Sequence, residues 1–511
     1  MSGDVLAPLT GPAFRIADKA DLEEFLARPE SADAVRSASF EQVFFTIKAL
    51  GLGDAIELLP HVSSRQVRGF IDLDCWRKDH FVRRPFMEWM SAFIQAGPEE
   101  TVRALGGVDE DVIALFLKDL IEVYEVERDD PPPATELTFT PDGRLAVRQK
   151  ASGDAASVAV LILDALFRHD PDLGFRVLRR VRYTTRTELE ETAYQNKVRR
   201  LDVHGFVDYY EALSIYAEPD DGETFGKPSS RPGSAEAIPG DTAPQQLPTV
   251  FADSLSGGPF LLAALEGLRE TDSVRLADEL TALGNRILSA NLVNLGEVEG
   301  IRSALGELRD LLTIGLEHLS GGDTRAASAV LAGNHIQSVF RTGFSQIARL
   351  RNAAGRLTRI PGFTPELLES PDAEFAGGLD RFKPLLWTGK EYRSFRSVGE
   401  VEEAAARIDR LAALAGGFLE LFGRVQPTLR RTFNTALIRQ AVSGRCEPVP
   451  LEAGELESFL AGGVPELPSP NLPARLQPLA REWLEKLSRE LEPLAGRKVD
   501  PRFVDCVHMR L

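Results

Sequence analysis

The sequence has few cysteines and no long apolar run, and each absence excludes a class of protein. Its 511 residues contain three cysteines, Cys75, Cys446 and Cys506, which are too scattered for a disulfide framework or a metal cluster. The longest apolar run, residues 156–163, is interrupted by Asp164 and is well short of the roughly 20 residues that a membrane-spanning helix needs. We therefore expect a reducing compartment and no membrane insertion.

An excess of positive charge is also missing. The 77 acidic residues outnumber the 59 Lys and Arg residues, which gives a formal net charge of −18. A surface of this sign repels nucleic acid and anionic membranes, so we expect neither as a partner. Residues 1–10 show no basic region followed by an apolar segment, which argues against a secretion signal and for a cytoplasmic location.

Three common catalytic motifs do not occur. The chain contains no Gly-x-x-x-x-Gly-Lys-Ser/Thr loop, no Gly-x-Ser-x-Gly elbow and no His-Glu-x-x-His pair. Their absence argues against ATP hydrolysis by a P-loop and against the usual hydrolase mechanisms. We assign no catalytic residue and expect no cofactor.

What is present is an internal repeat. Residues 59–74 align without a gap on residues 94–109, at an offset of 35 residues, and both copies end in Asp. A fainter third copy covers residues 170–178. Repeats of this length are typical of stacked helix pairs, because one unit does not cover its own apolar face. We therefore predict a helical superhelix for the N-terminal half.

The remaining patterns predict a mainly α protein. Apolar residues recur at helical spacing over most of the chain, including residues 109–126, while residues 137–147 alternate around a Pro-Asp-Gly turn as in a β-hairpin. A strand is also predicted over residues 503–511. The predicted organisation is a helical repeat region over 1–127, the β-hairpin and further helices over 128–217, a disordered Pro-rich linker over 218–248, a helical bundle over 249–445, and a Pro-rich segment over 446–511.

Two resemblances add to this interpretation. Residues 50–125, with the phrase that begins at Leu58 and the ending Ile121-Glu-Val-Tyr124, loosely resemble the N-terminal helical superhelix of MgtE-type magnesium transporters, but the channel is absent. Nearly the whole chain is similar to the uncharacterised bacterial domain-of-unknown-function family 6178. The motifs that carry this second likeness are Trp76-Arg-Lys-Asp79, Arg200 to Leu213, Leu319-Ser-Gly-Gly-Asp323 and Phe340 to Ser345. It implies a fold and no reaction.

Asp72, Asp74 and His80 lie in the densest cluster of reactive side chains. The two carboxylates are suitable ligands for a hard cation, and His80 adds a nitrogen ligand or a base. The alternative interpretation is a helix that ends at Asp72, with Trp76 packed beneath it and the charges in a solvated loop. We favour the alternative because nothing in the pattern fixes three ligands in one place.

A second candidate segment contains Asp202, His204, Asp208 and Tyr209, followed by a second tyrosine and a glutamate. A histidine beside a carboxylate can act as a general base, and the tyrosines can line a pocket. The alternative interpretation is that this segment is a turn between two helices and that its aromatic residues anchor the second helix to the core.

Arginines at helical spacing form the only notable basic run, and they are Arg176, Arg179, Arg180, Arg182 and Arg186. Such a face binds phosphates or an acidic partner, although a salt-bridged face is favoured in so acidic a chain. His335 is interpreted as a partnered core histidine. Cys506 and His508 have no second ligand pair, which argues against zinc.

Two functional hypotheses follow. The first is a non-catalytic helical repeat protein that presents an interaction or scaffold surface to a protein partner. The second is a metal-responsive regulator or an enzyme that uses residues 72–80 or 202–211. We favour the first because no catalytic set converges in the sequence.

Overall fold

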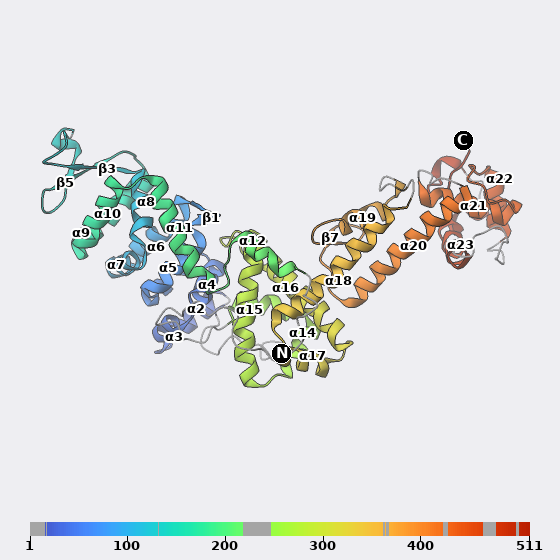
Figure 1. The fold of residues 1–511 in the computed structure, drawn as a ribbon, viewed down its shortest axis with the longest axis horizontal. Helices are drawn as coiled ribbons and strands as arrows, with labels where there is room; N and C mark the ends of the chain where they lie inside the picture. The colour runs from blue at the N-terminus through green and yellow to red at the C-terminus, as the bar shows by residue number, and fades with distance from the viewer. Residues whose placement is uncertain are drawn as a thin grey trace. The chain divides into compact units, whose positions relative to one another are not determined.

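The computed structural model describes residues 16, 18–130, 132–217, 247–360, 363, 367–422, 428–462, 477–496 and 500–510. Helices make up most of this part of the chain, and strands are confined to small antiparallel sheets (Figure 1). The predicted mainly α fold is therefore confirmed. The chain divides into two compact units, Met1–Arg341 and Thr342–Leu511.

The first unit begins with short amphipathic helices around an aromatic core. These elements are α2 (Lys19–Leu26), α3 (Ser31–Ser37), α4 (Phe40–Leu50), the 3-10 helix η1 (Ile56–His61), α5 (Ser64–Asp74), α6 (Arg83–Ala96), α7 (Pro98–Gly107) and α8 (Glu110–Lys118). Ser63 caps α5 in a box with Gln66, which fixes where that helix begins. Phe70 of α5 and Trp89 of α6 are fully buried with ring centroids 5.0 Å apart.

The two copies of the repeated phrase provide α5 and α7, and these helices contact each other. The approach is close, because a Cβ atom at Gly107 of α7 would lie 2.1 Å from the Ser64 carbonyl oxygen. Arg68 of α5 donates to the Gly107 carbonyl oxygen at 2.7 Å and strengthens the same contact. A repeated superhelix stays a prediction.

A three-stranded sheet follows α8, and it corrects one prediction. The strands are β3 (Ile121–Glu125), β4 (Thr138–Phe139) and β5 (Leu145–Gln149), in the order β3-β5-β4. The predicted hairpin is β4 and β5, with Gly143 at φ 67° in its turn. The predicted helix over 109–126 is wrong beyond Lys118, because Ile121 and Val123 alternate with half-buried residues and pair with β5.

Further helices complete the first unit. They are α9 (Asp154–His169), α10 (Pro171–Tyr183), α11 (Arg186–Asp202), α12 (Tyr209–Ala212), α13 (Thr249–Ser256), α14 (Pro259–Glu266), α15 (Glu270–Ala290), α16 (Val298–Ser320), α17 (Thr324–Gly333) and the start of α18 (Ile336–Leu357). Two 3-10 helices also belong to this unit: η2 (Ala134–Glu136) lies between β3 and β4, and η3 (Leu213–Tyr216) follows α12. Helix α8 contacts both α10 and α11.

The elements on either side of the predicted linker belong to this same unit. Helix α13 contacts α4, and the ring of Phe251 lies 5.6 Å from that of Phe45. Gly205, at φ 84°, approaches α15 so closely that a Cβ atom there would lie 2.5 Å from the Ala282 carbonyl oxygen. Residues 218–246 of the predicted linker lie outside the described residues.

The second unit is helical with one small hairpin. Its elements are α19 (Asp372–Leu379), β6 (Leu386–Trp387), β7 (Tyr392–Arg393), α20 (Val398–Phe422), α21 (Leu429–Ser443), α22 (Ala453–Gly462), α23 (Gln477–Leu491), η5 (Glu492–Leu494) and η6 (Pro501–Phe503). The predicted C-terminal strand is wrong: the described residues there form η6 and a single bridge between Leu451 and Met509. Among the described helices, none has the length and apolarity needed to cross a membrane.

Candidate functional site

A buried charge cluster joins α5, α8 and α11. The Arg200 guanidinium of α11 donates to both carboxylate oxygens of Asp72 on α5, at 2.7 and 2.8 Å. The same guanidinium lies 2.8 Å from Asp109, the residue that precedes α8. Asp72 is almost completely buried, so one arginine neutralises two carboxylates inside the unit.

Burial and pairing act in opposite directions on these groups. Loss of water contact raises the pKa of Asp72, and the hydrogen bonds from Arg200 only partly offset that rise. For Arg200, burial lowers the pKa, but its bonds to Asp72 and Asp109 more than compensate and the net shift is upward. The ions of this cluster are therefore buried together, because each charge is compensated by an opposite charge.

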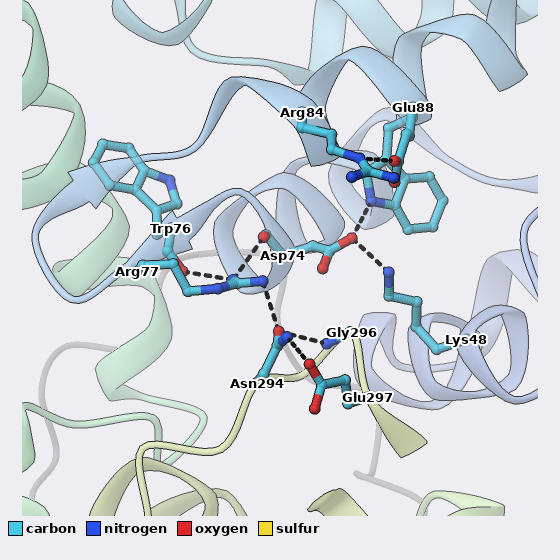
Figure 2. A network of polar contacts seen from close by, with 10 residues as sticks. Lys48, Asp74, Trp76, Arg77, Arg84, Glu88, Asn294, Gly296 and Glu297 are labelled. Carbon is cyan, nitrogen blue, oxygen red and sulfur yellow. Dashed lines mark hydrogen bonds and ion pairs between the residues drawn. The ribbon is translucent and has the colours of Figure 1, made fainter. Parts of the chain in front are cut away.

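Asp74, two residues further along α5, is the centre of a separate network (Figure 2). Its carboxylate accepts from Lys48 Nζ at 2.7 Å and from the indole N–H of Trp89 at 2.8 Å. Its backbone carbonyl accepts from Arg77 at 3.1 Å. Arg77 in turn donates to the Asn294 side-chain oxygen at 2.6 Å, which attaches the segment between α15 and α16 to the strand after α5.

We expect Asn294→Ala to lower the free energy of unfolding by about 0.5–1.5 kcal/mol, because the variant loses the exposed bond from Arg77 together with two local bonds, from the Gly296 amide and to Glu297. Urea titration of the purified chain measures this change. The matched control is Arg84→Ala, which removes an exposed pair with Glu88 in the same view and should cost about 0.3–0.5 kcal/mol. Equal losses in the two variants would contradict a tethering role for Asn294.

The third member of the predicted metal cluster lies apart from the two aspartates. The His80 side chain is 77% exposed, and its nearest acids are Asp79 at 3.6 Å and Glu190 at 4.0 Å. The predicted solvated loop is correct for His80 but wrong for Asp72 and Asp74, and α5 ends at Asp74 rather than at Asp72. Within the described ranges, no three His, Cys, Asp or Glu side chains gather as metal ligands.

In the second candidate segment, His204 points inward, Tyr209 is half-buried, and both aspartates are exposed. His204 Nδ1 lies 2.8 Å from the fully buried carboxylate of Glu41, and its ring packs edge-on against Phe40 at 4.7 Å. The pair therefore anchors the end of α11 to α4. Asp202 and Asp208 are exposed, and Asp208 caps α12 through the Tyr210 amide.

An exposed aromatic patch occupies the outer face of this segment. Tyr210 is 80% exposed and Val203 is 42% exposed. The Tyr209 ring lies 5.3 Å from that of Tyr210 in an edge-on arrangement. We call Val203, Tyr209 and Tyr210, with the acids Asp202, Asp208 and Glu211, the tyrosine–acid surface.

The arginine run is largely a salt-bridged face. Arg176 and Arg180 both pair with Glu110 of α8, and Arg180 also lies 2.5 Å from Asp111. Arg182 pairs with Asp129, and Arg186 pairs with Asp119. Arg179 is exposed and forms no ion pair with another described residue. Most of this charge holds α10 and α11 against α8 and the sheet.

The other candidates have internal partners. His335 lies 3.2 Å from Glu279. His508 Nε2 lies 2.8 Å from the Thr428 hydroxyl oxygen, and its backbone amide donates to Thr435. Burial lowers the pKa of His508 and raises that of Cys506 to about 11, so the thiol stays protonated at neutral pH.

One site escaped the sequence analysis. Lys197 of α11 lies over the neighbouring rings of Trp76 and Tyr194, with Nζ 5.6 and 5.3 Å from centroids that are 6.0 Å apart. Tyr194 and Lys197 are three positions apart on one helix, a spacing that is visible in the sequence. Trp76 comes from the β1 (Trp76–Arg77) and β2 (His80–Phe81) hairpin, and no local pattern indicates that it meets α11.

Comparisons with known proteins give a family without an activity. A family model described as "Family of unknown function (DUF6178)" matches residues 15–510. No curated protein and no solved structure matches the chain.

Proposed function

Because the chain belongs to the family of unknown function DUF6178, which carries no assigned activity, we propose from its geometry that it is a non-catalytic scaffold for a protein partner. The tyrosine–acid surface is the observation that carries this proposal. Tyrosine is enriched at protein interfaces because its rigid ring contributes much contact area at little entropic cost. A ring that is 80% exposed gains most from being covered by a partner.

The contacts of the other candidate residues support a non-catalytic role. Asp72, Asp74 and His204 each pair with a charged group on another helix, and these pairs hold the unit together. A metal ion at Asp72 or Asp74 would have to displace a paired cation, and His204 attaches the end of α11 to α4. The alternative of a metal-responsive regulator therefore has less support than a scaffold.

The chemistry of the surface indicates the kind of partner. Asp202, Asp208 and Glu211 are exposed acids close in sequence to the two tyrosines, although Glu211 lies 3.9 Å from Arg286. An arginine or lysine from a partner can lie over a tyrosine ring and contact a neighbouring carboxylate at the same time. We infer a protein partner with a basic segment and place the interaction in the cytoplasm, as the charge and cysteine usage suggest.

We expect Tyr210→Ala to weaken capture of this partner at least about tenfold, because a central interface tyrosine contributes more than about 1–2 kcal/mol. The measurement compares proteins cross-linked to the full chain and to the variant in native cytosol by quantitative mass spectrometry. Leu161→Ala is the matched control, since Leu161 is 46% exposed on α9, outside the tyrosine–acid surface. The proposal fails if both variants capture the same proteins as the unmodified chain, or if both lose them equally.

A further inference from the structure

The negative charge of the chain belongs to the first unit alone. The second unit, residues 342–511, contains 24 Lys and Arg residues against 22 Asp and Glu residues, which gives a net charge of +2. The first unit, residues 1–341, therefore carries a net charge of −20. The positive charge of the second unit is concentrated in residues 342–360 and 381–397, which together contain nine Lys and Arg residues and one acid. An anionic partner that the first unit repels is thus attracted by part of the second.

The segment over 381–397 contains the β6–β7 hairpin, which packs on α19 (Figure 1). The Tyr392 ring lies so close to this helix that a Cβ atom at Gly378 would be 2.9 Å from it. Arg393 donates to both carboxylate oxygens of Glu400, at 2.9 and 2.7 Å, and this pair attaches the hairpin to α20. The hairpin is therefore fixed to two helices, and its outward side chains are presented from a rigid support.

Exposed cations lie beside this hairpin without a carboxylate partner. Arg381 and Lys390 are both exposed, and neither forms an ion pair with another described residue. Arg381 lies over the Tyr392 ring, 4.9 Å from its centroid, which places it next to the turn that carries Lys390. Phe382 is 53% exposed. We call Arg381, Phe382, Lys383 and Lys390 the basic hairpin surface.

We propose that the basic hairpin surface binds an acidic segment of a protein partner, and that an apolar side chain of this segment covers Phe382. Arginine forms paired hydrogen bonds with carboxylates, and arginine and aromatic residues are enriched at the centres of protein interfaces. This partner is opposite in charge to the basic one inferred for the tyrosine–acid surface. The proposal therefore goes beyond the scaffold function: the chain binds two partners of opposite charge, one through each unit.

The aromatic rings of the hairpin distinguish an acidic protein from a nucleic acid. Single-stranded nucleic acids bind where successive bases stack on open ring faces. Here the Tyr392 ring is covered by Arg381 and lies 4.9 Å from the Trp387 ring, and its hydroxyl donates to the Glu374 carbonyl oxygen at 3.0 Å. Of the three rings, only that of Phe382 is mostly exposed. The surface offers positive charge and one apolar contact, and it lacks a row of stacking sites.

Fluorescence anisotropy with the full chain tests the proposal. The probes are a labelled oligoglutamate peptide with one central tryptophan, the same peptide with alanine in place of the tryptophan, and a single-stranded oligonucleotide of equal net charge. We expect Lys390→Glu to weaken binding of the tryptophan peptide at least about fivefold, because it replaces an attraction with a repulsion. The matched control is Lys486→Glu, at an exposed position on α23 of the same unit, which should change this affinity less than about twofold.

Phe382→Ala tests the apolar contact separately. It should weaken binding of the tryptophan peptide at least about threefold and leave binding of the alanine peptide unchanged. Tyr210→Ala should bind both peptides as the unmodified chain does, so this proposal and that of the tyrosine–acid surface fail independently. The proposal is overturned if neither peptide binds, if the oligonucleotide binds more tightly than both peptides, or if Lys390→Glu and Lys486→Glu weaken binding equally.

Discussion

Arg200→Met is expected to destabilise the first unit by about 3–5 kcal/mol, which is the usual cost of removing one partner from a buried ion pair. The substitution keeps the unbranched apolar stem of the side chain. It leaves the carboxylates of Asp72 and Asp109 in a buried site without their common cation. The penalty comes from desolvated negative charge and not from a lost contact area.

Hydrogen exchange under increasing urea is the suitable measurement, because the chain has two units and a single global transition need not describe both. Peptides from α5 and α11 report the unit that contains the cluster. Arg199→Met is the matched control, since Arg199 is exposed on the same helix and should change stability by less than about 0.5 kcal/mol. Indistinguishable results for the two variants would refute the structural importance of the cluster.

A second substitution separates charge from shape. Asp72→Asn in the Arg200→Met background removes one of the two carboxylates that have lost Arg200, so it should recover part of the lost stability. Alone, Asp72→Asn replaces one of the two acceptor oxygens with an N–H₂ donor that faces Arg200 and should destabilise the chain. The difference between these two effects is the coupling energy of the pair.

Local signals predicted much of the fold. Thr185 and Glu188 form the capping box that begins α11, and Gly321, at φ 62°, ends α16. The same reasoning failed at Ile121, because Leu120 and Ile121 continue the apolar spacing of α8. Pairing with β5, about 25 residues away in the chain, decides that segment, and this pairing is not local information.

The candidate site was less predictable for a related reason. The repeat places Asp74 and Asp109 at equivalent positions, yet their partners differ: Asp74 pairs with Lys48, whereas Asp109 pairs with Arg200. Asp72 and Arg200 are 128 positions apart, and no spacing rule connects them. The residue types in the sequence indicated where charged side chains are concentrated. Only the tertiary contacts show that these side chains pair with one another and stabilise the fold.

Lys197→Met is expected to stabilise the first unit by on the order of 2–3 kcal/mol at pH 7, the opposite sign to Arg200→Met. Burial lowers the folded-state pKa of Lys197 from 10.5 to about 8, and each pKa unit corresponds to about 1.4 kcal/mol of preference for the neutral amine. At neutral pH the folded chain must therefore hold an amine in a charged form that its surroundings disfavour. Methionine fills a similar volume over the two rings without a charge.

The pH dependence gives this expectation its test. The pKa of Lys197 is lower in the folded state than in the unfolded state. The stability that its neutral amine contributes is therefore fully present above about pH 10.5, and it is lost as the pH falls through about 8. The difference in unfolding free energy between Lys197→Met and the unmodified chain should thus be largest at or below pH 7 and shrink towards pH 10.5. Comparing the two proteins at each pH cancels the groups that titrate in both. Lys78→Met, at an exposed position, should show no such trend. A constant difference across this range would mean that Lys197 is solvated in the folded state.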